Sequence, residues 1–395
     1  MRRVASGMRH VAVGLVVSLL GVCVTLGALE VGMRLFAPQP TKVSVPAIID
    51  PDLIYRLPPH ARGTDVKEEF AVKIETNSQG LRDREYPAEK SAGVVSRILV
   101  LGDSMTFAEG AEAEETYPKV LERALADRYG AGRYEVINAG IRGYGTDQEL
   151  VLFERLVPIY HPDIVLLAFF AGNDFDDNVY GNLFAVEGDR LVRLPLSDES
   201  SPKYRYYRRQ SFIQTFPGYR ILIEHSHLMN FVRRWWAAKE FSRLFATAEK
   251  PDPVWEERAW RLTRSILVAW VERARGRGIR PLIVMIPSWN QIYVGRDDKV
   301  DPRTERVIAL ARARGVPVID PRQALRAGTQ AREPVFHPRD RHFTPYGHRL
   351  VATFLQECLS VMRIVPRPER GESRGRGRDM SAGIGGVGGG PTCGE

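Results

Sequence analysis

Short apolar runs alternate with segments of helical period from residue 97 onward. The apolar runs lie at 97–101, 134–138, 163–170, 281–286 and 316–319, and the helical segments at 117–128, 147–160, 254–275, 302–314 and 345–361. A continuous apolar run of this length is typical of a strand buried on both faces, and such strands alternate with helices in parallel sheets. The pattern therefore predicts the α/β class, with a five-stranded parallel sheet in a three-layer α/β/α sandwich.

A different pattern opens the chain. Residues 11–29 carry no charge, and Arg2, Arg3 and Arg9 precede them without an acidic residue. A helix of 19 residues spans about 28 Å, close to the thickness of a bilayer core. The arginine excess predicts a cytoplasmic N-terminus, with everything after the helix outside. We expect an uncleaved, single-pass signal anchor. The alternative is a cleaved signal peptide, whose apolar stretch is usually shorter, about 7 to 15 residues, and ends at a small-residue cleavage site.

These patterns divide the chain into four expected parts. Residues 1–36 are the cytoplasmic N-terminus and transmembrane anchor, and residues 37–95 a tether with a small β-containing region around 70–81. Residues 96–365 form the α/β domain. Residues 366–395 are rich in Gly, Arg and Pro, a composition that cannot support a packed element and predicts a disordered tail.

An insertion at about 175–253 interrupts the strand and helix alternation. Within residues 201–250, ten basic residues face three acidic ones, and aromatic residues are interleaved with them. Two interpretations remain open. The segment is either a helical subdomain with an ordinary aromatic core and a solvated basic face, or a lid that touches substrate or lipid headgroups.

Composition narrows the function classes. A chain of 395 residues with 44% hydrophobic and 26% charged residues is neither disordered nor a polytopic membrane protein. Its three cysteines are too few and too scattered for a disulfide framework or a cysteine-based zinc site. The net charge is +8. Nucleic acid is not expected as a partner. Under the expected topology the basic segment lies on the outer side of the membrane, and it contains no recognised binding motif.

Three strand ends carry residues suited to acyl transfer. Ser104 follows the first run in Gly-Asp-Ser, Gly140 ends Asn-Ala-Gly after the second, and Asn173 follows the third in Gly-Asn-Asp. Reactive groups of parallel sheets collect at the carboxyl ends of strands. A serine hydroxyl, unobstructed amides and a neutral side-chain amide are the parts of a nucleophile and an oxyanion hole. Each motif alone is also a common turn sequence.

A base for the serine is predicted in the segment Asp340-Arg-His342. In an extended loop residues i and i+2 point the same way, so Asp340 can hold one imidazole nitrogen of His342 while the other faces Ser104. His348, on the following helix, is expected to be a packing or surface residue. His337, Asp340, His342 and His348 also suggest a metal cluster, but they match no established metal-ligand spacing, so neither a metal nor a cofactor is expected.

Together these blocks resemble the SGNH hydrolases, also called the GDSL esterase/lipase family, over about residues 97–361 outside the insertion. The resemblance implies that Ser104 is the nucleophile, that Asp340 and His342 complete the triad, and that the Ser104 amide, the Gly140 amide and Asn173 form the oxyanion hole. Many members place the last block as Asp-x-x-His, whereas Arg339 stands three residues before His342 here. The Asp-x-His spacing is similar to that of membrane-associated branches, including alginate-type O-acetyltransferases.

The expected function is a membrane-anchored serine esterase that hydrolyses O-acyl groups, chiefly acetyl, on a carbohydrate or cell-envelope polymer. Three alternatives stay open. The same acyl-enzyme could pass its group to a polysaccharide hydroxyl. The substrate could be a membrane lipid ester. Lastly, the chain could be a non-catalytic polysaccharide-binding or assembly component, which the intact set of four blocks disfavours.

Overall fold

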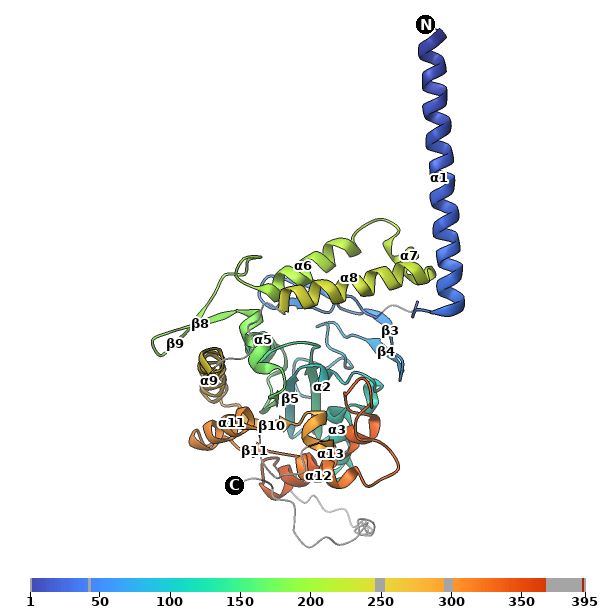
Figure 1. The fold of residues 1–395 in the computed structure, drawn as a ribbon. Coiled ribbons are helices and arrows are strands. Elements are labelled where there is room, and N and C mark those ends of the chain that lie inside the picture. Colours follow the sequence, from blue (N-terminus) through green and yellow to red (C-terminus); the bar gives the residue numbers. More distant parts are fainter. Residues whose placement is uncertain (1, 42–43, 246–252, 295–300, 367–392, 394–395) are drawn as a thin grey trace.

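The computed structural model describes residues 2–41, 44–245, 253–294, 301–366 and 393, and consists of one long N-terminal helix and a layered body (Figure 1). The centre of the body is a sheet of five strands in the order β11-β10-β7-β5-β6. Every neighbouring pair is parallel. The strands are β5 (Ser96–Gly102), β6 (Tyr134–Gly140), β7 (Ile164–Phe170), β10 (Arg280–Ile286) and β11 (Val318–Ile319). The predicted five-stranded parallel sheet is confirmed.

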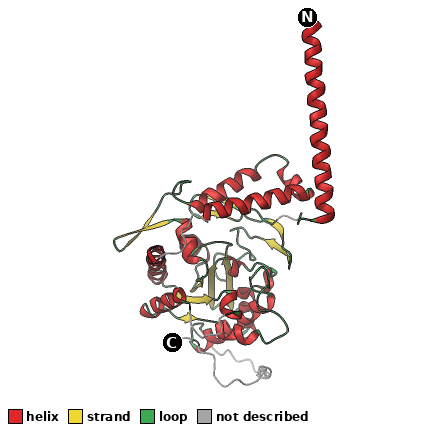
Figure 2. Cartoon of the chain, in the orientation of Figure 1, coloured by secondary structure: helices red, strands yellow, loops and turns green. Residues whose placement is uncertain are grey.

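Helices cover both faces of this sheet, as Figure 2 shows. Alternate side chains of each strand enter two separate apolar cores: Leu99 and Leu101 of β5 lie in one, Ile98 and Val100 in the other. The first core packs on α4 (Thr146–Tyr160), α9 (Pro253–Gly276) and α11 (Pro302–Ala313). The second packs on α3 (Tyr117–Tyr129), α12 (Arg322–Gly328) and α13 (Pro345–Val361). Burial on both faces explains why the strands read as continuous apolar runs.

The segment before the sheet forms two antiparallel hairpins rather than one small region. They are β1 (Ile48–Asp50) with β2 (Ile54–Arg56), and β3 (Arg62–Val66) with β4 (Ala71–Glu75). A third apolar core, including Val72 and Ile74 of β4, packs against Phe107 beside the end of β5. The β3–β4 hairpin therefore packs on the edge of the sheet where Ser104 lies.

The insertion is mostly helical, and it also contains a hairpin that the sequence pattern did not predict. Its helices are α5 (Asp174–Gly181), α6 (Pro202–Gln214), α7 (Tyr219–His225) and α8 (His227–Phe245). The hairpin pairs β8 (Phe184–Glu187) with β9 (Arg190–Arg193). In Figure 1, α6, α7 and α8 lie together at the end of the body nearest α1.

The N-terminal helix α1 (Arg2–Phe36) includes a stretch, Ala12–Phe36, that is long and apolar enough to cross a membrane. Its apolar side chains are exposed, with Val13, Leu19 and Val24 all above 60%. The expected disordered tail falls almost entirely outside the described residues. Within them, Cys393 forms a disulfide with Cys358 of α13, a single bridge that the cysteine count had not suggested.

Candidate active site

Ser104 stands at the first position of the short helix α2 (Ser104–Phe107), directly after β5. Asp103 caps this helix: its Oδ1 atom accepts a hydrogen bond of 2.8 Å from the Met105 amide. The first amides of a helix have no intrahelical partner, so the cap leaves the Ser104 N–H in a position to donate to a ligand. The sharp strand-to-helix turn thus presents both the hydroxyl and the amide of Ser104 at the sheet edge.

His342 connects Ser104 to Asp340. The Nε2 atom of His342 lies 2.8 Å from the Ser104 Oγ atom, and Nδ1 lies 2.5 Å from the Asp340 Oδ1 atom. The expected extended loop is wrong, however. Arg341 has φ +66°, in the left-handed region, and its amide donates to the His337 carbonyl. A tight turn, closed by the bridge between Phe336 and Phe343, brings the carboxylate and the imidazole together.

Two charged residues that the sequence analysis did not identify complete the surroundings of His342. Lys67, from the turn between β3 and β4, bonds Asp340 Oδ2 at 2.7 Å and also pairs with Glu109. The Glu109 Oε2 atom lies 4.0 Å from Nδ1 of His342, and its Oε1 atom lies 3.1 Å from Arg142. These contacts could not be predicted from the sequence, because 273 positions separate Lys67 from Asp340.

These neighbours shift the pKa of His342 upward. Burial acts in the other direction, but the hydrogen bond to Asp340 and the negative charge of Glu109 outweigh it. Burial likewise tends to raise the pKa of Asp340, yet the bonds to His342 and Lys67 hold it well below its usual range. Asp340 is therefore a carboxylate at neutral pH, able to orient the imidazole and stabilise its protonated form.

Gly140, the last residue of β6, lies against the backbone of α2. A Cβ atom at this position would lie 2.4 Å from the Phe107 nitrogen, so only glycine fits against that backbone. In this structure the Gly140 amide donates to the Asn138 Oδ1 atom at 3.0 Å. An oxyanion would have to share or replace that bond.

Asn173 lies beside the same turn and is positioned by Asp103. The Asn173 Nδ2 atom donates to Asp103 Oδ2 at 3.0 Å, which leaves its second amide hydrogen for another acceptor. Asp103 is fully buried, and burial raises the pKa of its carboxyl to about 6 although the Met105 amide and Asn173 act in the opposite direction. The Gly-Asp-Ser and Gly-Asn-Asp segments are thus joined by a side-chain hydrogen bond.

The other two histidines considered from the sequence, His337 and His348, have partners other than Ser104. His348 is completely buried on α13, where its Nδ1 atom accepts from the Tyr117 amide at 3.3 Å. The ring of His337 stacks obliquely on Phe70 and its Nε2 atom lies 3.2 Å from the Gly110 carbonyl. Among the described residues, the acidic and histidine groups close enough to hold an ion together are Glu109, Asp340 and His342. Two of these belong to the hydrogen-bonded chain on Ser104, which does not match the four-residue cluster considered from sequence.

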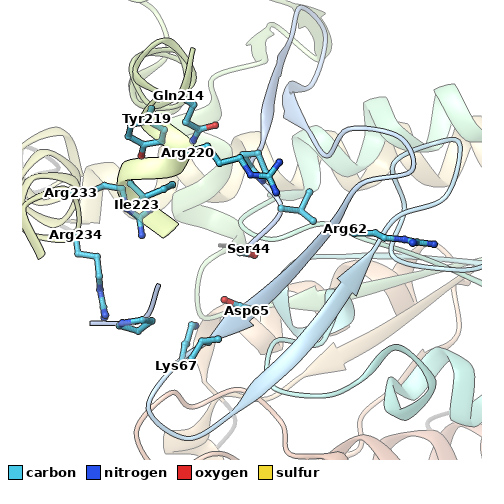
Figure 3. Close-up of a pocket in the computed structure, with 14 residues that line it drawn as sticks. Ser44, Arg62, Asp65, Lys67, Gln214, Tyr219, Arg220, Ile223, Arg233 and Arg234 are labelled. Carbon is cyan, nitrogen blue, oxygen red and sulfur yellow. The ribbon is translucent and has the colours of Figure 1, made fainter. Parts of the chain in front are cut away.

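Two cavities border the site. One of about 430 Å³ adjoins Asn173 and is lined by the rings of Tyr206, Tyr207 and Phe241 together with Asp176, Asp177 and Lys203. The other, of about 450 Å³, lies between the insertion and β3, with Lys67 in its wall (Figure 3). Its lining also includes Arg220, Arg233 and Arg234. The first cavity is aromatic and mixed in charge, and the second is strongly basic.

Comparisons with known proteins give one family match. The family described as GDSL-like Lipase/Acylhydrolase matches residues 100–350. No curated protein matches the chain. Similar solved structures include a lipolytic protein of the G-D-S-L family from Desulfitobacterium hafniense (15% identity, 66% of this chain and 98% of that one, TM-score 0.37). Others are the acetyl xylan esterase AlAXEase (16%, 67% and 99%, TM-score 0.39) and a catalytic mutant of the acetylxylan esterase Axe2 from Geobacillus stearothermophilus (15%, 68% and 95%, TM-score 0.38).

Proposed function

The chain belongs to the GDSL-like lipase/acylhydrolase family, and we propose that it is a serine esterase in which Ser104, His342 and Asp340 form the catalytic triad. The observation that carries the proposal is the continuous chain of short contacts from Ser104 Oγ through the imidazole to Asp340. The order and spacing of these three groups are those that activate a serine nucleophile.

The proposed reaction has two acyl-transfer steps. The Ser104 Oγ atom attacks the ester carbonyl while Nε2 of His342 takes its proton, giving a tetrahedral oxyanion. His342 then returns that proton to the leaving alcohol, and the carbon–oxygen bond to the alcohol breaks to form an acyl-serine. Water, deprotonated by His342, then attacks the acyl-serine carbonyl. The bond between the acyl carbon and Ser104 Oγ breaks, His342 returns the proton to Oγ, and the carboxylic acid leaves.

Three donors support the oxyanion in this proposal. They are the Ser104 amide at the start of α2, the free hydrogen of the Asn173 amide, and the Gly140 amide, whose bond to the Asn138 side chain the oxyanion would share or replace. Donors of this kind lower the barrier because they are aimed at the charge that develops in the transition state. No metal or cofactor has a role in these steps.

The proposed substrate is an O-acylated carbohydrate, with acetyl as the acyl group. The cavity beside Asn173 favours this class, because its tyrosine and phenylalanine rings offer flat apolar surfaces and its two aspartates offer hydrogen-bond acceptors. A sugar presents the matching combination of apolar ring faces and hydroxyl donors. A membrane-bound lipid ester is the main competing substrate.

Transfer to a sugar hydroxyl would use the same acyl-enzyme and differ only in the acceptor. The test is to incubate the purified full-length protein with nitrophenyl esters of increasing chain length, with and without acetyl-acceptor oligosaccharides. Acceptor-independent release of acetate that is absent from Ser104→Ala supports hydrolysis, and acceptor-dependent turnover indicates transfer. Preference for long acyl chains would contradict the proposed acetyl substrate, and equal activity in Ser104→Ala would contradict the catalytic assignment.

A further inference from the structure

Helices α6, α7 and α8 leave an unusual amount of apolar surface uncovered. Nine large apolar side chains of these helices and the α6–α7 turn are 38–65% exposed, compared with four elsewhere in the described chain outside α1. The nine are Phe212, Phe216, Ile221, Leu222, Phe231, Val232, Trp235, Trp236 and Phe241. Single exposed apolar residues are ordinary, but a concentration of this size marks a surface that meets an apolar partner.

Four of the five exposed large apolar residues of α8 form one stripe, and the fifth, Phe241, instead lines the cavity beside Asn173. Phe231 and Trp235 are four residues apart, as are Val232 and Trp236, so the two pairs lie in adjacent rows along the helix. The Lys239 Nζ atom lies 5.0 Å from the Trp235 ring centre. Arg233 and Arg234 instead line the basic cavity on the inner side of the helix (Figure 3). The aromatic stripe therefore faces away from the body.

A set of hydrogen bonds joins this helical layer to α1. The Glu30 carboxylate of α1 accepts from the Ser226 hydroxyl (2.8 Å) and from the amides of His227 (3.0 Å) and Leu228 (2.9 Å). Those two amides are the first of α8, so Glu30 caps that helix. Arg34 also donates to the carbonyl of His225 at the end of α7. The start of α8 is thereby fixed next to Glu30 of α1.

Glu30 lies at the end of the uncharged segment of α1. Glu30 is the first charged residue after residues 11–29, which are long enough to cross a bilayer core. With those residues inside the bilayer, Glu30 and the start of α8 lie where the outer face of that bilayer meets water. Figure 1 shows that α8 and α6 run across the direction of α1 rather than along it, so both helices extend along the membrane surface.

We propose that α6, α7 and α8 form a membrane platform, whose exposed aromatic and aliphatic side chains insert into the outer surface of the bilayer that α1 crosses. Continuity with α1 identifies the occupant as that bilayer rather than a second copy of the chain. The composition agrees, because tryptophan, phenylalanine and leucine beside lysine and arginine are typical of helices that lie in the membrane interface. The basic cavity under the platform then lies close to lipid headgroups. The inference does not depend on the proposed esterase activity.

Site-specific fluorescence of the full-length protein in lipid nanodiscs tests the platform. Single cysteines replace Ile221 of α7 or Phe231 of α8 in a Cys23→Ser background, and each is labelled with an environment-sensitive NBD fluorophore. The matched control is Val361→Cys, since Val361 is an apolar residue 68% exposed on α13. The native Cys23, labelled in the wild type, reports whether α1 is inserted. Lipids carry a nitroxide quencher either near the headgroup or deep in the acyl chain.

The platform predicts blue-shifted NBD emission and strong quenching by the shallow nitroxide at positions 221 and 231, quenching by the deep nitroxide at Cys23, and no quenching at 361. Two cysteine positions on different helices guard against one variant that fails to fold, and folding is checked by the circular dichroism of each protein. Quenching at Cys23 without quenching at either 221 or 231 would overturn the proposal. Cross-linking between copies through these positions, again without quenching, would assign the surface to a second chain and overturn it as well.

Discussion

Two carboxylates face the same nitrogen of His342. Asp340 contacts Nδ1 directly, and Glu109 lies 4.0 Å from it, held by Lys67 and Arg142. The motif order was enough to predict Asp340 and His342 as partners of Ser104. The electrostatic setting could not be predicted, because Lys67 and Glu109 reach the site from a hairpin and a loop with no motif of their own.

Glu109→Gln tests this second carboxylate. The base must be neutral to take a proton, so wild-type activity should fall as the pH drops through the raised pKa of His342, above the reference value of about 6.5. Removing the negative charge of Glu109 removes one of the interactions that raise the pKa of His342. The acidic limb of the kcat/KM profile should therefore move to lower pH, and activity should persist further into acid. Glu75→Gln, an exposed carboxylate paired with Arg62, is the control and should leave the limb unchanged. An unshifted limb in Glu109→Gln would show that Glu109 does not act on His342.

His348→Ala separates a packing histidine from the proposed base. Burial lowers the pKa of His348 to about 3, with the positive charge of Arg82 acting in the same direction. The unfolded imidazole titrates near 6.5, so the unfolded state binds the proton first and the native state loses stability as the pH falls from about 6.5 to 3. The variant should lose about 2 kcal/mol or more at pH 7 because a buried ring is removed. The variant has no imidazole at this position, so its stability should not show the part of the decrease between about pH 6.5 and 3 that His348 causes in the wild type. Denaturant unfolding of both proteins at several pH values measures this difference.

The activity of the same variant supplies the contrast. His348→Ala should keep kcat within a few-fold of wild type under conditions where it is folded, whereas His342→Ala should lose roughly 10³-fold or more. An inactive, folded His348→Ala beside an active His342→Ala would reverse the assignment of the base.

Elements buried on both faces were the most predictable part of the fold. The five strands stand where continuous apolar runs predicted them, since such a run in this chain has no solvent-facing side. The β8–β9 hairpin was missed, although a signal exists. Gly188-Asp189 separates two short runs by exactly the two residues of a tight hairpin turn, and Gly188 has φ +60°. Its strands have only four residues each and are partly exposed, so they lack a strong alternation.

Glu30→Ala tests how α1 holds α8. The change removes the acceptor of the first two α8 amides, and a lost N-terminal cap costs about 1 kcal/mol, which corresponds to about fivefold faster hydrogen exchange through local opening. Amides in the first two turns of α8 should therefore exchange faster in detergent or nanodiscs. Glu224→Ala on α7, which breaks only the exposed pair with Arg220, should leave those amides unchanged. Equal exchange in Glu30→Ala and wild type would mean that the cap does not stabilise α8.

At the scale of the whole molecule, the chain combines a long apolar helix, the helical layer at its base and the sheet whose edge carries Ser104 (Figure 1). The sequence predicted the anchor and the sheet separately, but it could not predict that the insertion would lie between them. That placement depends on the long-range bonds of Glu30 and Arg34 to α7 and α8. The proposed outside location of the sheet agrees with the Cys358–Cys393 disulfide, because such bonds persist in oxidising compartments.

Topology has its own test. An alkaline phosphatase fused after residue 365 should be active in a bacterial host, and the protein should remain with membranes after carbonate washing. Thiol counting on the unfused protein in denaturing detergent should give one reactive cysteine, Cys23, before reduction and three after it. Release of a shortened, soluble chain would instead identify residues 11–29 as part of a cleaved signal peptide, and an inactive fusion would contradict the orientation.

Trapping the acyl-enzyme tests the central proposal most directly. The protein is mixed with a fluorophosphonate probe or, at low pH to slow deacylation, with nitrophenyl acetate, and the modified peptide is identified by mass spectrometry. We predict a single adduct on Ser104, absent from Ser104→Ala and strongly reduced in His342→Ala, with both variants retaining the wild-type circular dichroism. Labelling of Ser104→Ala at the wild-type level, or an adduct on another residue, would contradict the account.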